Sequence, residues 1–252
     1  MSIRPYINER FDGVIWRMEI DELSETLCVE VRNNEEKKVH FASLDLSNGE
    51  TFFNSLATPE RWLTGIETVY NGVLLLHFYQ SETGPTHKGL LAIDAVTGKT
   101  LWSNFSWAFD HLTINGPAVY DTKIQPRKLF LIDVKTGATI RGYEPSVDLE
   151  SKNSVALPEI KTSDFSDLNQ LSTLVAGNMI HYLEYNNLRI VSLHALNEGQ
   201  LTQLLYVMKD DNVIYEDLLN SGIQKIQPEA FIIHKNHLIY IKDKSALKVL
   251  AL

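Results

Sequence analysis

The sequence predicts an all-β chain built from repeated antiparallel sheets, and three observations support this prediction. A nine-residue pattern that reads as a hairpin turn occurs three times. Asn-Gly dipeptides, typical of tight hairpins, occur between copies of that pattern. Apolar segments of strand length flank both features, and their average spacing suits a four-stranded repeating unit.

The repeated pattern occupies residues 44–52, 93–101 and 132–140. Each copy begins with an aliphatic residue, Asp and two variable positions. These are followed by Asn or Thr, then Gly, one variable residue, Thr and an apolar residue. The Asp carboxylate can accept hydrogen bonds from the next backbone N–H groups, and Gly supplies the positive φ of the reversal. We therefore interpret the Asp residues as structural turn caps and not as metal ligands. The turn residues are Asp45 and Gly49, Asp94 and Gly98, and Asp133 and Gly137.

The spacing of these turns predicts the size of each repeat. The Asp residues are 49 and 39 positions apart, with a mean of 44, and the dipeptides at 71–72 and 115–116 are also 44 apart. Two hairpins per repeat give four strands, which is the composition of a propeller blade. The sequence thus predicts a small β-propeller of four-stranded antiparallel blades, about five in number with a range of four to six.

The blades follow each other along a single predicted domain, residues 1–252. The last blade has only three strands of its own, so we expect an N-terminal strand from within residues 3–20 to complete it and close the ring. Two stretches lack a clear strand pattern: 144–169 is expected to be a polar loop or short helical insertion, and 213–219 a helical stretch ended by residues 220–222. The predicted blades span about 14–54, 62–104, 107–143, 170–208, and 223–252 with the N-terminal strand.

Residues 89–102 resemble the repeat of the PQQ-like, or quinoprotein alcohol dehydrogenase-like, propeller superfamily: an aliphatic strand, Asp, Thr-Gly-Lys and a closing Trp. The resemblance is weaker around Asp45 and Asp133 and covers about half of the chain. It implies that Trp102 packs between blades, with Phe53 and Arg141 at the equivalent positions. The chain looks like a member of an uncharacterised bacterial family of unknown function.

The resemblance does not carry the quinoprotein activity with it. Such enzymes look larger and exported, with a vicinal cysteine pair and a Ca²⁺ site, whereas Cys28 is the sole cysteine of this chain. We therefore expect no cofactor and no metal. The lipobox cysteine of related outer-membrane assembly propellers is missing as well.

Composition limits the partners. The net charge of −9 disfavours nucleic acid and anionic membranes, and the short basic segment 123–128 is interpreted as a solvated turn. The N-terminus lacks a signal-peptide core, and no apolar run is long enough to cross a bilayer. We expect a cytoplasmic monomer.

Two groups of residues are candidates for a site. Trp107, Asp110 and His111 join the second and third blades and could bind a small molecule or sugar by stacking and hydrogen bonding, or could serve only inter-blade packing. His77 and His181 occupy similar places in their blades and could face each other across a channel, as a metal or acid/base pair, or be buried in the sheets.

No catalytic motif accompanies these residues. The sequence therefore favours a non-catalytic scaffold that binds a protein or small molecule on one face. The alternative is an enzyme whose acid and base groups converge in the central channel. The candidates for that role are His77, Asp110, His111, His181 and Glu184.

Overall fold

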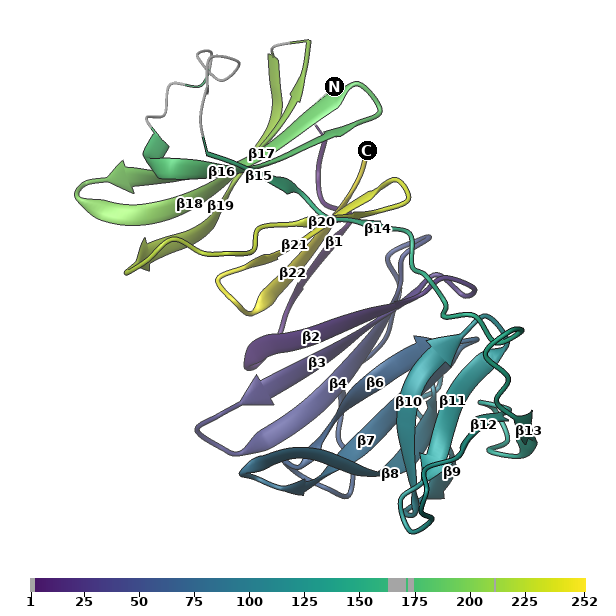
Figure 1. Cartoon of the computed structure of the whole chain (residues 1–252). Helices are drawn as coiled ribbons and strands as arrows, with labels where there is room; N and C mark the ends of the chain where they lie inside the picture. The colour runs from purple at the N-terminus through teal and green to yellow at the C-terminus, as the bar shows by residue number, and fades with distance from the viewer. Residues whose placement is uncertain (1–2, 163–170, 172–174, 211) are drawn as a thin grey trace. The chain divides into compact units, whose positions relative to one another are not determined.

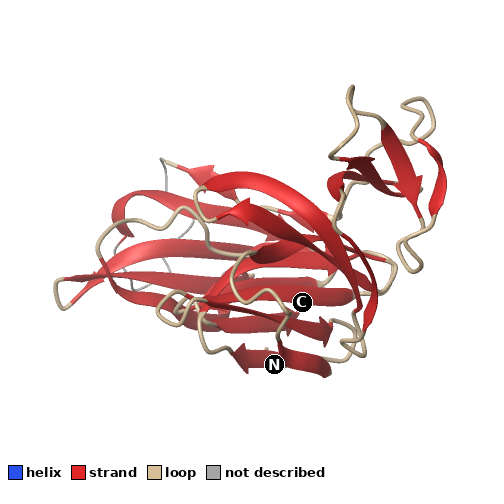
Figure 2. Ribbon diagram, turned by 90° about the horizontal axis from the view of Figure 1, so that it is seen from below, coloured by secondary structure: helices blue, strands red, loops and turns tan. Residues whose placement is uncertain are grey.

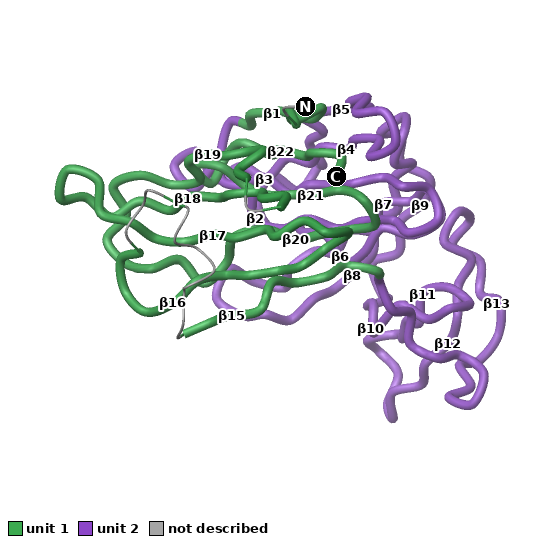
Figure 3. Tube along the Cα trace, turned by 90° about the horizontal axis from the view of Figure 1, so that it is seen from above, with its two compact units in different colours: residues 1–11, 154–252 green, residues 12–153 purple. Residues whose placement is uncertain are grey.

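The computed structural model describes residues 3–162, 171, 175–210 and 212–252. All regular secondary structure in these residues is β-strand (Figure 2). Accordingly, this described part of the chain offers no helix with the length and apolarity needed to cross a membrane. The chain divides into two compact units, unit 1 (residues 1–11 and 154–252) and unit 2 (residues 12–153), coloured separately in Figure 3. Whether the two form one domain stays a prediction.

Unit 2 contains three four-stranded antiparallel sheets, each with its strands in sequence order (Figure 1). The first sheet comprises β2 (Val14–Asp21), β3 (Thr26–Asn33), β4 (Lys38–Asp45) and β5 (Thr51–Leu56). The second comprises β6 (Thr64–Tyr70), β7 (Val73–Ser81), β8 (Gly84–Asp94) and β9 (Thr100–Asn104). The third comprises β10 (Trp107–Thr113), β11 (Gly116–Asp121), β12 (Leu129–Ile132) and β13 (Thr139–Gly142).

Unit 1 contains two further antiparallel sheets, each with a short fifth strand. The fourth sheet comprises β15 (Glu159–Lys161), β16 (Val175–Tyr185), β17 (Leu188–Asn197), β18 (Gln200–Lys209) and β19 (Asn212–Ile223). The fifth has the order β1 (Ile7–Arg10), β22 (Ala246–Ala251), β21 (His237–Lys242), β20 (Ile232–His234) and β14 (Val155–Ala156). The N-terminal strand pairs with the C-terminal one, with Ile7 opposite Val249.

These sheets confirm the predicted fold class: an all-β chain of five up-and-down antiparallel blades, the last completed by the N-terminal segment. The completing strand contributes to the core, since Ile7 is 2% exposed. Pairing of the two chain ends also covers the edge of β22 that would otherwise be open to solvent.

One local prediction was wrong and a second was incomplete. Residues 213–219 form no helix but lie within β19, because β-branched and aromatic side chains from Val213 to Tyr215 suit a strand that pairs along β18. The insertion predicted at 144–169 contributes β14 and β15, which add to the edges of the two sheets of unit 1. Residues 163–169, and the predicted start of the fourth blade at 170, lie outside the described residues.

The repeated turns share one geometry. In the second copy Asp94 Oδ1 accepts from the backbone N–H groups of Val96 and Thr97 at 3.1 and 2.7 Å, and Gly98 N donates to Asp94 O at 2.9 Å. Hydrogen bonding from the Thr97 backbone lowers the pKa of the Asp94 carboxyl. The φ angles of the three turn glycines at 49, 98 and 137 are 80°, 69° and 71°, in the region where a side chain is strained.

Aromatic residues at the end of one blade pack on the glycine turn of the next. Trp102 of β9 donates from Nε1 to Val134 O at 2.7 Å, and a Cβ placed on Gly137 would lie 2.7 Å from the indole Cδ2. Phe53 of β5 lies against Gly98 in the same way, although its nearest ring atom would be 3.5 Å from an added Cβ.

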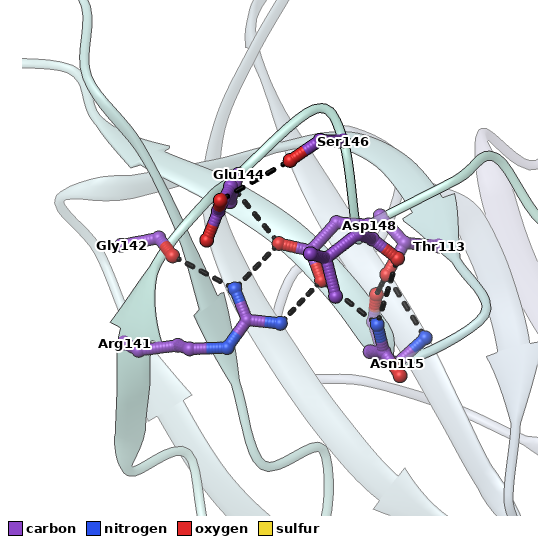
Figure 4. A network of polar contacts seen from close by, with 9 residues as sticks. Thr113, Asn115, Arg141, Gly142, Glu144, Ser146 and Asp148 are labelled. Carbon is purple, nitrogen blue, oxygen red and sulfur yellow. Dashed lines mark hydrogen bonds and ion pairs between the residues drawn. The ribbon is translucent and has the colours of Figure 1, made fainter.

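The third blade breaks this series. Its equivalent residue, Arg141 of β13, forms a two-pronged ion pair with the buried carboxylate of Asp148 (Figure 4). Asp148 also accepts from Asn115 Nδ2 at 2.9 Å and from Glu144 N at 2.8 Å. The segment after β13 is thereby fastened to the β10–β11 hairpin.

Candidate functional site

The first strand of every sheet in unit 2 carries a one-residue β-bulge. In β2, β6 and β10 the register shifts between positions 15 and 17, 66 and 68, and 109 and 111. The extra residues are Trp16, Glu67 and Asp110. A bulge bends the strand and redirects a side chain, and bulges are frequent beside functional sites. Two of these three residues are carboxylates, and each lies at the centre of a polar cluster.

The first of these clusters, called the Asp110 cluster, comprises Asp110, His111, Arg127, Tyr120 and Tyr143. Asp110 contacts His111 Nδ1 through Oδ2 at 2.8 Å and accepts from Arg127 Nη1 through Oδ1 at 3.0 Å. The Arg127 guanidinium lies 3.5 Å from the centre of the Tyr120 ring, and the His111 ring meets Tyr143 edge-on at 5.3 Å. Asp110 and His111 are each 24% exposed and Arg127 is 51% exposed, so the cluster is accessible to solvent.

The ring of Trp107 serves packing in the structure. It meets Phe130 edge-on at 5.2 Å and Trp102 of the preceding blade at 6.5 Å. These contacts correspond to the inter-blade packing considered as the alternative for this residue. The aromatic rings that contact Arg127 and His111 are instead those of Tyr120 and Tyr143.

The second cluster, called the His77 cluster, comprises Glu67 of β6, His77 of β7 and His87 of β8. Glu67 Oε1 lies 2.8 Å from His87 Nδ1 and 3.4 Å from His77 Nδ1. The two imidazoles are stacked, with centroids 3.5 Å apart and planes 6° from parallel. Among the described residues, these three form the one group of His, Cys, Asp or Glu side chains whose ligand atoms all lie within 4.8 Å of one another.

The imidazole of His77 is deeply buried and makes no hydrogen bond. Its side chain is 2% exposed, and neither ring nitrogen has a hydrogen-bond partner. Burial, assisted by the neighbouring His87 and by Arg17 and Arg32, lowers the pKa of His77 to about 3. The imidazole is therefore neutral near pH 7.

A buried ion pair lies beside the His77 cluster. Arg32 Nε donates to Glu30 Oε1 at 2.6 Å, and its Nη2 donates to Thr64 O at 2.7 Å. The other oxygen of Glu30 accepts from Ile66 N at 2.9 Å, so the pair joins the first and second sheets. The guanidinium also lies 5.0 Å from the centre of the Trp62 ring.

The remaining predicted site residues belong to unit 1. His181 is buried, and its Nε2 lies 3.0 Å from Pro228 O. Glu184 accepts from the hydroxyl of Tyr182. Because His77 lies in unit 2, the proposed pairing of His77 with His181 stays a prediction.

Sequence reasoning missed Glu67, His87 and Arg127 as site residues. Glu67 and His87 are 20 positions apart and meet only because β6, β7 and β8 pair side by side with shifted registers. A detectable signal was present: Glu67 precedes its Asn-Gly hairpin by four residues and Asp110 precedes its own by five, both in the first strand of a repeat.

Comparison with protein families found one match. Residues 20–102 match a domain of unknown function, DUF4905. The match covers fewer than half of the residues; it includes the His77 cluster and ends before the Asp110 cluster. No curated protein matches the sequence.

Solved structures with similar features share little sequence with the chain. They include BamB from Moraxella catarrhalis (9% identity, TM-score 0.23, 96% of this chain and 59% of that one), a europium-containing methanol dehydrogenase (10%, 0.33, 96% and 52%) and an endo-arabinase from Bacteroides thetaiotaomicron VPI-5482 (11%, 0.28, 100% and 96%). The chain thus spans little more than half the length of the first two. TM-scores this low carry no inference about function.

Proposed function

We propose that the chain is a non-catalytic binding module whose Asp110 cluster binds a small molecule bearing a carboxylate group. The observation that supports this most directly is that the side chain of Arg127 is held in place and exposed at the same time. Its guanidinium is tethered by Asp110 at 3.0 Å and held against the Tyr120 ring at 3.5 Å, yet half of the side chain is exposed. An arginine held in place in this way loses little conformational freedom when it binds a ligand.

The chemistry of the cluster suits a carboxylate ligand. A guanidinium presents parallel N–H groups that match the two oxygens of a carboxylate. His111, which shares Asp110 with Arg127 and is 24% exposed, adds a second polar group. Exposed Lys123 and Lys128 belong to the same loop as Arg127 and raise its local positive charge. The proposal includes the cytoplasmic location and monomeric state expected from the sequence, which cell fractionation and light scattering would test.

The test is binding of a panel of small mono-, di- and tricarboxylates, followed by backbone amide NMR shifts of the whole chain. We expect a binder among them whose shifts centre on residues 110–111 and 120–127. Arg127→Ala should weaken its affinity by about 10–100-fold, since charge-assisted hydrogen bonds contribute about 1.5–3 kcal/mol.

Lys128→Ala is the matched control. It removes an exposed cation next to Arg127 and should change affinity only modestly, with an effect that salt abolishes. A panel without any binder, or a binder equally tight in Arg127→Ala, would contradict the proposal.

One contact favours a second function. The 2.8 Å contact of Asp110 with His111 Nδ1 is the arrangement in which a carboxylate orients an imidazole as a general base. If the chain is an enzyme, hydrolysis of some member of a broad ester, phosphate and glycoside panel should disappear in both Asp110→Asn and His111→Gln. Turnover that survives both substitutions would exclude this role for the pair.

A further inference from the structure

We propose that Glu67, His77 and His87 bind a divalent transition-metal ion such as Zn²⁺, on residues separate from those of the proposed carboxylate site. Two imidazoles and one carboxylate form a donor set that Zn²⁺ and related ions favour. The three side chains come from three adjacent strands of one sheet, so strand pairing fixes their relative positions.

The burial of His77 is the first reason. Both of its ring nitrogens are enclosed without a hydrogen-bond partner, although nearly all buried polar groups have one. Leaving such a group unsatisfied is costly, and a bound cation would engage one of the nitrogens directly. A buried imidazole used only for packing would be expected to give at least one nitrogen a partner, as His194 and His181 do with Gln227 N and Pro228 O.

The spacing of the donor atoms is the second reason. Zn²⁺ binds nitrogen and oxygen at about 2.0–2.2 Å, which places tetrahedral ligand atoms about 3.3–3.6 Å apart. The separation of His77 Nδ1 from Glu67 Oε1 is already 3.4 Å, and that of His87 Nδ1 from the same oxygen is 2.8 Å. Binding requires the second distance to open slightly and the two stacked rings to tilt, because each imidazole lone pair lies in its ring plane. His87 has room to tilt because it is 31% exposed.

The backbone and the charges around the cluster accommodate this ion. At Gly65 an added Cβ would lie 2.9 Å from His77 Cε1 and 3.1 Å from Glu30 Oε2, so the absence of a side chain there makes space for the imidazole. Two arginines of the first sheet are already paired: Arg32 with Glu30 at 2.6 Å and Arg17 with Glu19 at 2.8 Å. The negative charge of the Glu67 carboxylate is therefore available to the bound ion.

The experiment is calorimetric titration of the metal-free full chain with Zn²⁺ alone, with X-ray absorption of the Zn²⁺-loaded chain as a second readout. We expect one ion per chain, bound by two imidazoles and oxygen ligands. His87→Ala should lower the affinity at least tenfold, because even losing a partner outside the ligand shell typically costs 10–100-fold. Zn²⁺ should also raise the unfolding temperature of the wild-type chain and not that of the variant.

Two variants separate a built site from incidental binding. His40→Ala removes a half-buried histidine from β4 of the same unit and should leave Zn²⁺ affinity unchanged. Glu67→Gln keeps the size of the side chain, removes its charge and should weaken binding as His87→Ala does. Failure of the wild-type chain to bind Zn²⁺, or equal affinity in the wild-type chain and His87→Ala, would overturn the proposal. No variant of the buried His77 is used, so the test does not depend on the folding of a core variant.

Discussion

Replacing Gly137 by Ala tests how consecutive blades are joined. Gly137 has a φ of 71°, and a Cβ there would lie 2.7 Å from Cδ2 of Trp102, 3.0 Å from Cγ and 3.1 Å from Cε2. Gly98 occupies the same place in the preceding repeat with a φ of 69°, but its added Cβ would meet nothing nearer than Leu56 Cδ1 at 3.4 Å. The two substitutions therefore share the backbone strain and differ in the clash.

The magnitudes follow from these two terms. A left-handed backbone costs an alanine about 1–2 kcal/mol, and overpacking against a fixed ring adds about 1–3 kcal/mol. Gly98→Ala should then lower the free energy of unfolding by about 1–2 kcal/mol and Gly137→Ala by about 2–5 kcal/mol. The clash cannot be relieved cheaply, because the indole is held by its hydrogen bond to Val134 O at 2.7 Å.

Guanidinium unfolding followed by circular dichroism measures both values. A double-mutant cycle then identifies the cause: in a Trp102→Leu background, the cost of Gly137→Ala should fall to that of Gly98→Ala. Equal losses for the two glycines in the wild-type background, or a cost at Gly137 that does not depend on Trp102, would refute the packing of this indole on the next blade's turn.

Two further substitutions test the closure of the last sheet and the network of Figure 4. Ile7→Ala should destabilise unit 1 by about 2–5 kcal/mol, because it removes a side chain that is only 2% exposed from the N-terminal strand. The exposed neighbour is the control, and Asn8→Ala should have little effect. Equal effects of the two substitutions in thermal unfolding would contradict the pairing of β1 with β22. Hydrogen bonds from Arg141 lower the pKa of the Asp148 carboxyl, so its contribution to stability is complete above the unfolded pKa of about 3.9 and is lost as the pH falls below it. Asp148→Asn should therefore lower the unfolding temperature at pH 7 and flatten its acid dependence; an acid dependence as steep as the wild type's would contradict this assignment.

The parts of the fold that sequence predicted well are those fixed by neighbouring residues. The turns at Asp45, Asp94 and Asp133 depend on hydrogen bonds that reach only two or three residues along the chain, so each leaves a local pattern. The helix predicted for 213–219 lies within a strand whose pairing with β18 contains three register shifts, and these shifts disrupt the alternation of a regular strand.

The site was less predictable because it depends on contacts between strands. Asp110 and His111 are adjacent in sequence and their contact could be anticipated, but Arg127 reaches Asp110 across 17 residues. Glu67 becomes a neighbour of His77 and His87 only through the bulge of β6, which the sequence indicates only by the distance of Glu67 from its Asn-Gly hairpin. For Trp107 the sequence offered both a ligand platform and inter-blade packing, and the ring contacts with Trp102 and Phe130 correspond to the second of these.

The carboxylate panel, applied to the wild-type chain and Arg127→Ala in parallel with amide shifts as the readout, tests the proposed Asp110 site. We expect a carboxylate whose shifts concentrate on the bulge of β10 and the loop after β11, and whose affinity falls at least tenfold without the guanidinium. Shifts that concentrate elsewhere, or that persist unchanged in Arg127→Ala, would contradict it.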